Sequence, residues 1–283
     1  LVGSEMCIRD RYGTEGGKVE KRRYCHMRNT ERLYDRVIEK MDMTCDMEDE
    51  ELQELIHEVL EEASKEEFIP LQEKNEFKLT AEELEKYTTP KTKVLVLPFP
   101  NNPTGAIMTR EDLEPIAKFV EEHDLYVMSD EIYSELTYKE EHVSIASLPG
   151  MRERTLVING FSKGFAMTGW RLGYVIANPE IIDRVKKVHD FLTVGAAAPL
   201  MEAATVGLKF DDKHYDELAA HYAHMKEVFV GGLEKLGLKY TDPQGAYYVL
   251  VDVSEFGVKD DVKFCEWLAQ YVGVAAVPGS SFF

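Results

Sequence analysis

The stretch RTLVINGFSKGFAMTGWRLGYVIAN, residues 154–178, places two short apolar runs on either side of a glycine-containing segment. Runs 154–160 and 172–178 are rich in valine, isoleucine and leucine, and each ends in a polar or turn-forming residue, which is typical of strands buried on both faces. The segment between them carries Lys163 and Arg171. A lysine beside a serine is most often a solvated surface residue, so the rest of the chain must decide whether Lys163 has a chemical function.

Two further apolar runs of the same kind lie earlier in the chain, at residues 93–100 and 124–130. The residues between them, 109–123, have apolar side chains at helical spacing and begin with Thr109 and Asp112, a pair typical of a capping box. A strand, a helix and a strand in this order predict a three-layer α/β fold with a mostly parallel sheet and right-handed crossovers.

The second half of the chain shows helical and strand patterns in turn. Residues 180–208 predict a long helix with a loop inside it, and residues 214–237 predict another helix. After them come a predicted strand at 245–253, a predicted helix at 259–271 and a predicted strand at 272–278. This mixture predicts a smaller α+β unit at the C-terminal end.

These patterns divide the chain into three regions. Residues 76–208 are expected to form part of a large α/β domain, and residues 209–283 part of a small C-terminal domain. Residues 1–75 have a different character and are expected to form a separate helical segment. Its clearest element is an amphipathic helix at residues 50–63, with apolar side chains at helical spacing and an acidic opposite face.

Composition excludes several classes of partner. The chain has 283 residues and a formal net charge of −19, from 33 basic and 52 acidic residues, so nucleic acid and anionic membranes are not expected partners. No apolar run has the length of a membrane span, and the first residues lack the apolar core of a signal peptide. The 4 cysteines have no C-x-x-C spacing and the 8 histidines no metal-ligand spacing, so we expect reduced thiols, no metal site and a cytoplasmic location.

Polar side chains follow the predicted strands where each strand ends. Asn102 follows the first, Asp130 and Tyr133 follow the second, and Lys163 and then Arg171 follow the third. In a parallel α/β sheet, such positions meet at one edge. This set suits pyridoxal phosphate, because a lysine amine condenses with its aldehyde, a carboxylate pairs with its ring nitrogen and an arginine binds its phosphate.

The motifs NNPTG, SDEIYSEL and NGFSKGFAMTGWRLGY, in this order, resemble those of class I/II aminotransferases of the aspartate aminotransferase superfamily, the fold-type I pyridoxal phosphate enzymes. VHDFLTVGAAAPLMEA, DPQGAYYVLVD and VPGSSFF extend the resemblance over residues 76–283. It implies an enzyme of amino acid metabolism that moves an amino group between an L-amino acid and a 2-oxo acid, of the aspartate, aromatic, kynurenine or methionine type. Family members are homodimers, although dimerisation of this chain stays open.

The resemblance also implies a role for each candidate residue. Lys163 would bond to the cofactor and carry the proton, Asp130 would pair with the pyridine nitrogen, and Asn102 and Tyr133 would bond the ring oxygen. Arg171 would contact the phosphate.

Three other positions complete the comparison with the family pattern. Gly160 stands where many relatives carry a phosphate-binding serine, which puts one phosphate hydrogen bond in doubt but not the reaction. Tyr247 and Tyr248 are expected to be core or subunit-contact aromatics and not catalysts.

The resemblance is incomplete at both ends, so both domains are expected to be incomplete. Relatives carry a phosphate-binding helix start and a ring-stacking aromatic residue, neither of which is found in residues 1–75. They also carry an arginine for the substrate carboxylate beyond the position of Phe283. We therefore expect the chain as given to be a poor transaminase.

Two other interpretations stay open. DEELQELIHEVLEEASKEEFIPLQEK resembles the N-terminal helical region of pilus-assembly secretion ATPases, and LVGSEMCIRDR resembles a translated sequencing adaptor, which suggests a chimera with a junction near residues 70–80. An ATPase needs the loop G-x-x-x-x-G-K-[ST], but the nearest candidate, Gly17 and Lys18, has Tyr12 and Val19 at two required positions. The second interpretation is a non-catalytic fragment that binds the cofactor weakly.

Overall fold

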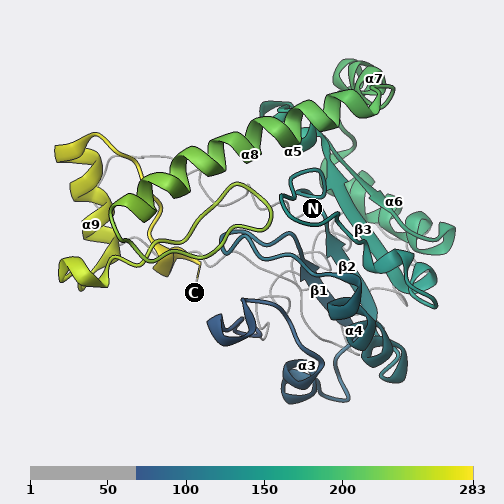
Figure 1. Ribbon diagram of the computed structural model, residues 1–283. Coiled ribbons are helices and arrows are strands. Elements are labelled where there is room, and N and C mark those ends of the chain that lie inside the picture. Colours follow the sequence, from purple (N-terminus) through teal and green to yellow (C-terminus); the bar gives the residue numbers. More distant parts are fainter. Residues whose placement is uncertain (1–67, 283) are drawn as a thin grey trace, which may run out of the picture.

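The computed structural model describes residues 68–282 (Figure 1). The helix expected at residues 50–63 and the loop candidate at Gly17 and Lys18 lie outside the described residues. Within the described part, a four-stranded sheet is flanked by helices, and one long helix runs from the sheet toward the C-terminal elements (Figure 1).

The sheet contains its strands in the order of the sequence. They are β1 (Val94–Pro98), β2 (Tyr126–Asp130), β3 (Thr155–Gly160) and β4 (Gly173–Ile176). The first three are parallel, and β4 is antiparallel to β3. Each strand lies within an apolar run predicted from the sequence, and the mostly parallel α/β fold is confirmed. Pro98 lies beside Asp130 and Asp130 beside Ile158, so the carboxyl ends of β1, β2 and β3 share one edge.

The core lies between the first two strands and helix α4 (Arg110–Glu122). Leu95 of β1 and Val127 of β2 belong to the same buried cluster as Ile116 and Val120 of α4. Ile116, Val120 and Val127 are fully buried, and each such side chain stabilises the fold by about 1.5–3 kcal/mol. The alternation along the strands and the helical spacing in α4 therefore place the helix against this part of the sheet.

The start of α4 has the predicted capping box. Thr109 Oγ1 accepts a hydrogen bond from the backbone of Asp112 at 3.3 Å, and Asp112 Oδ2 accepts one from the backbone of Thr109 at 2.8 Å. Asp112 also accepts from Lys78 Nζ at 2.8 Å. Burial alone would raise the pKa of Asp112, but these hydrogen bonds outweigh it and lower the pKa. The cap fixes the point at which the chain enters α4 after the loop that carries Asn102.

Replacing Thr109 with alanine is expected to lower the free energy of unfolding by about 1 kcal/mol, because the Asp112 N–H loses its side-chain partner. Urea unfolding followed by circular dichroism measures the change. Thr205→Ala is the matched control, since Thr205 is exposed inside a helix and bonds only the Glu202 carbonyl of that helix among the contacts described for it. Equal losses in both variants would show that the capping box has no special role.

The other helices that the sequence predicted are α6 (Pro179–Thr193), α7 (Ala198–Gly207), α8 (Asp212–Lys235) and α9 (Asp261–Trp267), which the π-helical turn η6 (Leu268–Val272) follows directly. Two short helices, α3 (Ala81–Tyr87) and α5 (Phe161–Gly164), were not predicted from the sequence. Short 3-10 turns are η1 (Glu73–Asn75), η2 (Ile145–Ser147), η3 (Arg152–Arg154), η4 (Thr168–Trp170), η5 (Ser254–Phe256) and η7 (Gly279–Ser281). The helix predicted at 180–208 is confirmed as α6 and α7, with the predicted loop between them.

The predictions of strands at residues 245–253 and 272–278 are wrong. A strand needs a neighbour whose backbone N–H and C=O groups pair with its own. In the described residues, the first segment has only single bridges, from Gly245 to Thr137 and from Val251 to Tyr240, and the second has no assigned bridge. The apolar, β-branched composition of both segments favours an extended backbone, but a strand also requires a neighbouring segment with which its backbone can pair.

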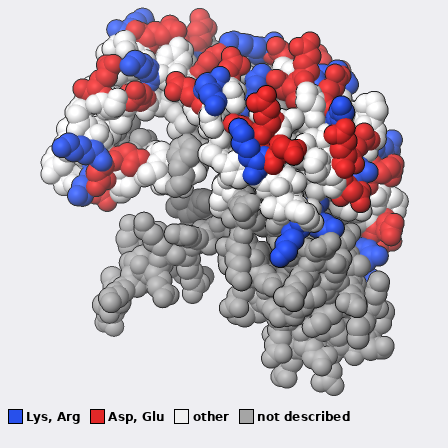
Figure 2. Space-filling view, turned by 90° about the horizontal axis from the view of Figure 1, so that it is seen from below, with Lys and Arg blue, Asp and Glu red and all other residues white. Residues whose placement is uncertain are grey.

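The described surface carries charged side chains of both signs. Figure 2 shows acidic side chains interspersed with basic ones over the face that it presents. No helix in the described part of the chain is both long and apolar enough to cross a membrane.

Candidate active site

Lys163 is buried at the carboxyl end of β3, where the short helix α5 begins, and only 5% of its surface is exposed. Its Nζ donates a hydrogen bond to Tyr247 Oη at 2.7 Å and lies 5.5 Å from the ring centroid of Tyr133. A buried amine in contact with phenol groups is not the solvated surface lysine that a Ser-Lys pair usually indicates, and such burial is common at functional lysines.

Asp130 ends β2, the strand next to that of Lys163. Burial is the largest influence on its carboxyl group and, with a smaller contribution from the charge of Glu131, raises the pKa of Asp130 to about 6. A hydrogen bond from the backbone of Ile132 to Oδ1, at 3.1 Å, acts in the opposite direction. A carboxylate whose pKa is raised in this way is stabilised by a cationic partner, because an opposite charge favours its ionised form.

The residue after Asp130 fixes the loop. Glu131 is 4% exposed and accepts hydrogen bonds from Ser129 Oγ at 2.9 Å and Ser144 Oγ at 2.7 Å. His142 Nε2 lies 2.9 Å from its other carboxylate oxygen, and the Glu131 N–H donates to the Ile158 carbonyl at 2.8 Å. Because its side chain is enclosed by these partners, Glu131 positions the loop, and Asp130 is the carboxylate available to a ligand.

The two adjacent asparagines after β1 have different surroundings. Asn101 holds the turn, since its Oδ1 accepts from Thr104 Oγ1 at 2.8 Å and its Nδ2 donates to the Pro98 carbonyl at 3.3 Å. Asn102 Oδ1 is buried and has no hydrogen-bond partner within residues 68–282. A buried amide group in this state indicates a place for a polar ligand atom.

Tyr133 lies directly beside the lysine. It is 2% exposed, and its ring packs edge-to-face on Tyr247 with the centroids 5.4 Å apart. The structure therefore brings Lys163 and Tyr133 together, as the sequence predicts. Their positions after neighbouring strands account for this, since each follows the carboxyl end of its strand.

Arg171 lies farther along, at the end of η4. It is exposed, has a left-handed backbone with φ of 56°, and donates from Nη1 to the Thr168 carbonyl at 3.1 Å. This contact lies within its own turn, so a role of Arg171 toward a phosphate stays a prediction.

Gly160 has a structural reason to lack a side chain. A Cβ at this position would lie 2.8 Å from the Leu172 carbonyl oxygen and 3.0 Å from Gly173 Cα. The antiparallel pairing of β3 and β4 brings these backbones together. The serine that many relatives are expected to carry here would require β4 to move, so the glycine belongs to the way this sheet packs.

Tyr247 is the residue whose place in the site the sequence analysis missed. The sequence predicts a core or subunit-contact aromatic there, but Tyr247 is 37% exposed and its hydroxyl contacts the amine of Lys163. The signal in the sequence is the Gly-Ala-Tyr-Tyr run after a helix. Without the fold, nothing connects that run to a lysine 84 positions earlier.

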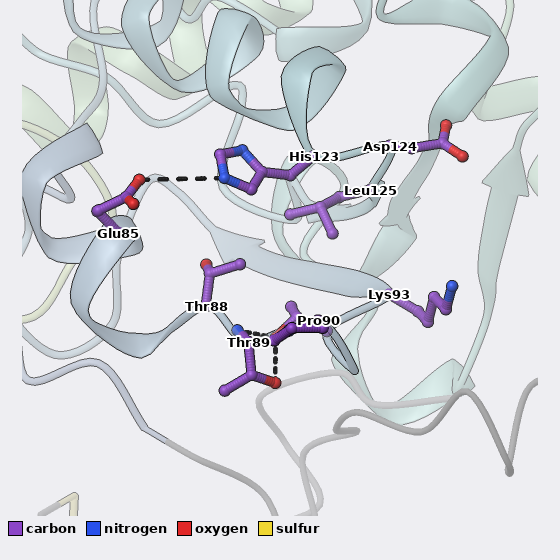
Figure 3. Close-up of a pocket in the computed structure, with 9 residues that line it drawn as sticks. Glu85, Thr88, Thr89, Pro90, Lys93, His123, Asp124 and Leu125 are labelled. Carbon is purple, nitrogen blue, oxygen red and sulfur yellow. Dashed lines mark hydrogen bonds and ion pairs between the residues drawn. The ribbon is translucent and has the colours of Figure 1, made fainter.

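A hollow of about 310 Å³ lies elsewhere on the molecule (Figure 3). Glu85 and His123 point toward each other across it with Glu85 Oε2 and His123 Nε2 4.0 Å apart, and Lys93 and Leu125 line it (Figure 3). Lys93 precedes β1 and Leu125 precedes β2, so this hollow is at the amino ends of the strands. Functional groups of parallel α/β sheets gather at the carboxyl ends, which is where Lys163 lies.

Comparison with known proteins gives consistent matches. The model of the family described as aminotransferase class I and II matches residues 62–283. The chain is 41% identical over 217 residues to an aspartate aminotransferase of Pyrococcus abyssi and 39% identical over 218 residues to aromatic-amino-acid aminotransferase 2 of Thermococcus litoralis. Each of these matches covers 76% of this chain and 56% of the relative, so the chain spans about half the length of the curated relatives it matches.

Solved structures match as well. The crystal structure of an aromatic aminotransferase from Pyrococcus horikoshii superposes with a TM-score of 0.71 at 43% identity, covering 76% of this chain and 58% of that one. Aspartate aminotransferase from Thermus thermophilus with maleate also has a TM-score of 0.71, at 37% identity, covering 76% of this chain and 56% of that one.

Proposed function

The chain belongs to the class I and II aminotransferases, and from this premise we propose that its candidate active site binds pyridoxal phosphate for amino-group transfer between an L-amino acid and a 2-oxo acid. The observation that carries the proposal is the buried amine of Lys163 at the end of β3, beside a phenol and one strand away from the half-buried carboxylate of Asp130. Membership of this family supports amino-group transfer as the reaction class, and the residues of the candidate site support pyridoxal phosphate as the cofactor.

The residues present fit this cofactor. Lys163 offers a buried amine, and Asp130 a carboxylate that a cation would stabilise in its ionised form. Asn102 has a buried amide oxygen without a partner among the described residues, and the amide nitrogen of the same side chain is the donor that a ring oxygen could accept from. Arg171, which is exposed near the same edge, has a guanidinium suited to a phosphate dianion.

Each residue then has a defined task. When bound, pyridoxal phosphate supplies an aldehyde that reacts with amines and a ring that withdraws electrons from the substrate α-carbon. Lys163 would hold the group through its amine and would supply the base that moves a proton at the substrate α-carbon. Asp130 would keep a proton on the ring nitrogen, and Asn102 and Tyr133 would orient the ring through its oxygen. Arg171 would hold the phosphate end.

The amino donor is proposed only as a class. The matched relatives include proteins named for aspartate, aromatic amino acids, kynurenine and methionine. We propose an L-amino acid of one of these types and a 2-oxo acid as the substrates, with a second copy of the chain as the partner in the working enzyme. A cytoplasmic location is proposed with them.

The test is the visible spectrum of the purified chain mixed with pyridoxal phosphate, followed by excess glutamate, aspartate, kynurenine or methionine in turn. Binding at Lys163 should produce an absorption band that free cofactor lacks, and an accepted amino donor should remove it. A spectrum equal to the sum of free cofactor and protein would contradict the proposal for this chain.

A further inference from the structure

The amine of Lys163 has a partner that no role assigned so far explains. Its Nζ donates to Tyr247 Oη at 2.7 Å and lies 5.2 Å from the centroid of the same ring. Lys163 is 5% exposed, whereas Tyr247 is 37% exposed. The phenol of Tyr247 is therefore a partly exposed partner of a buried amine.

Tyr247 belongs to a segment that is locked onto the other loops of the site. The Gly245 N–H donates to the Gly105 carbonyl at 2.8 Å, and the Ala246 N–H donates to the Leu136 carbonyl at 2.9 Å. A Cβ at Gly245 would lie 2.8 Å from the side chain of Pro100, closer than such atoms approach. The segment is thus pressed between the loop after β1 and the loop after β2, so the packing of these loops places Tyr247.

Three further tyrosines complete the surroundings of this phenol. Tyr133 contacts it edge-to-face, Tyr222 of α8 stacks on it with centroids 5.7 Å apart, and Tyr248 lies 4.8 Å away by the same measure. Rings on several sides leave the Tyr247 side chain little freedom to turn away. Its hydroxyl is therefore preorganised toward the amine of Lys163.

We propose that Tyr247 is a positioning residue for Lys163, whose hydroxyl holds the lysine amine whenever that amine has no covalent partner. The inference deepens the proposed function and rests on it for the catalytic consequence only. An amine must be free twice, before it captures the cofactor and while the substrate amine occupies its place. In both states Tyr247 keeps the amine at the carboxyl end of β3, because its hydroxyl accepts the hydrogen bond of the amine and its ring lies beside it.

The first experiment uses the cofactor-free chain and needs no activity. Acetic anhydride is added in a brief pulse at neutral pH, and mass spectrometry measures acetylation of each lysine. An amine that donates to Tyr247 Oη is held by that hydrogen bond and must leave it to react, so Lys163 in Tyr247→Phe should be acetylated about tenfold faster than in the parent, equivalent to about 1.4 kcal/mol. Tyr222→Phe is the matched control, since Tyr222 stacks on Tyr247 with no contact to the lysine among those described for it, and it should react at the parental rate.

Lysines elsewhere serve as internal references. Lys78 pairs with Asp112 and is far from Lys163 in the sequence, so it should be acetylated at the same rate in every folded variant. Should Tyr247→Phe not fold, Tyr247→Leu takes its place, because it also lacks the hydroxyl. Parental reactivity of Lys163 in a folded Tyr247 variant would overturn the proposal.

The second experiment connects the contact to the reaction. In a cofactor-loaded enzyme, Tyr247→Phe should lower kcat about tenfold and leave KM within about twofold, because it affects the freed amine and not substrate binding. If the parent captures no cofactor yet acetylation responds to Tyr247→Phe, the proposed function fails and the assignment of Tyr247 stands. If acetylation changes while kcat is unchanged, the positioning role in catalysis is overturned.

Discussion

Lys163→Ala is expected to abolish covalent capture of pyridoxal phosphate. In the parent, borohydride reduction should fix the cofactor on the peptide that contains Lys163, because this amine is buried beside Tyr133 at the edge of the sheet where Asp130 also ends its strand. In the variant, that nucleophile is gone and no label should remain there. Amino transfer by an active enzyme should fall by several powers of ten, as is usual when a nucleophile is removed.

Lys226 provides the matched control. It is also partly buried, donates to the Pro243 carbonyl and has its Nζ 5.0 Å from the ring centroid of Tyr138. Burial, the largest influence on its amine, lowers the pKa of Lys226, so this amine is more reactive than that of an ordinary surface lysine. Lys226→Ala should leave the labelling of Lys163 unchanged. Label on Lys226, or spread over many surface lysines, would contradict the assignment of Lys163.

The part of the site that the sequence predicted consists of residues next to strand ends. Asn102, Asp130, Tyr133 and Lys163 each lie at or within a few positions of the end of an apolar run, and parallel pairing aligns those ends without further information. Local pattern therefore determines their location once the strands are identified. The capping box at Thr109 is of the same kind, because its two partners are three residues apart.

The part that the sequence could not predict depends on contacts between distant segments. Tyr247 reaches Lys163 only because Gly245 fits between the side chain of Pro100 and the Leu136 carbonyl, which no local pattern reveals. The strands predicted at 245–253 and 272–278 failed for a related reason. Their composition suits a strand, but pairing is a property of the neighbouring segment and not of the run itself.

The second large effect concerns Asp130, where loss of function and gain of stability are expected together. In a cofactor-loaded enzyme, Asp130→Asn removes the anion that keeps a proton on the ring nitrogen. Breaking one side of a buried ion pair costs about 3–5 kcal/mol, so turnover should fall by about 10²–10⁴-fold. Steady-state amino transfer measures the loss, and Asp183→Asn, at an exposed site on α6, should retain full activity.

In the cofactor-free protein the same substitution should stabilise the fold. Burial raises the pKa of Asp130 from 3.8 to about 6, so between these values the folded state binds a proton more readily than the unfolded state. The stability of the parent is therefore greatest below the unfolded pKa and falls as pH rises through that window, reaching a constant penalty above it. An asparagine in place of Asp130 does not titrate. At neutral pH the free energy of unfolding of the variant should therefore exceed that of the parent by about 1–3 kcal/mol, and in acid the two values should be equal.

Urea unfolding of parent and Asp130→Asn across this pH range measures the effect. A constant offset at every pH would mean that the carboxyl group is not desolvated as its surroundings indicate. Saturating pyridoxal phosphate should then reverse the order, because a ligand stabilises the state that binds it and the parent should bind the ring more tightly. The Asp130 carboxylate would then destabilise the cofactor-free protein and stabilise the cofactor-bound protein. Binding of the ligand would explain why this carboxylate is desolvated, and this is the physical argument for placing Asp130 at the ring nitrogen.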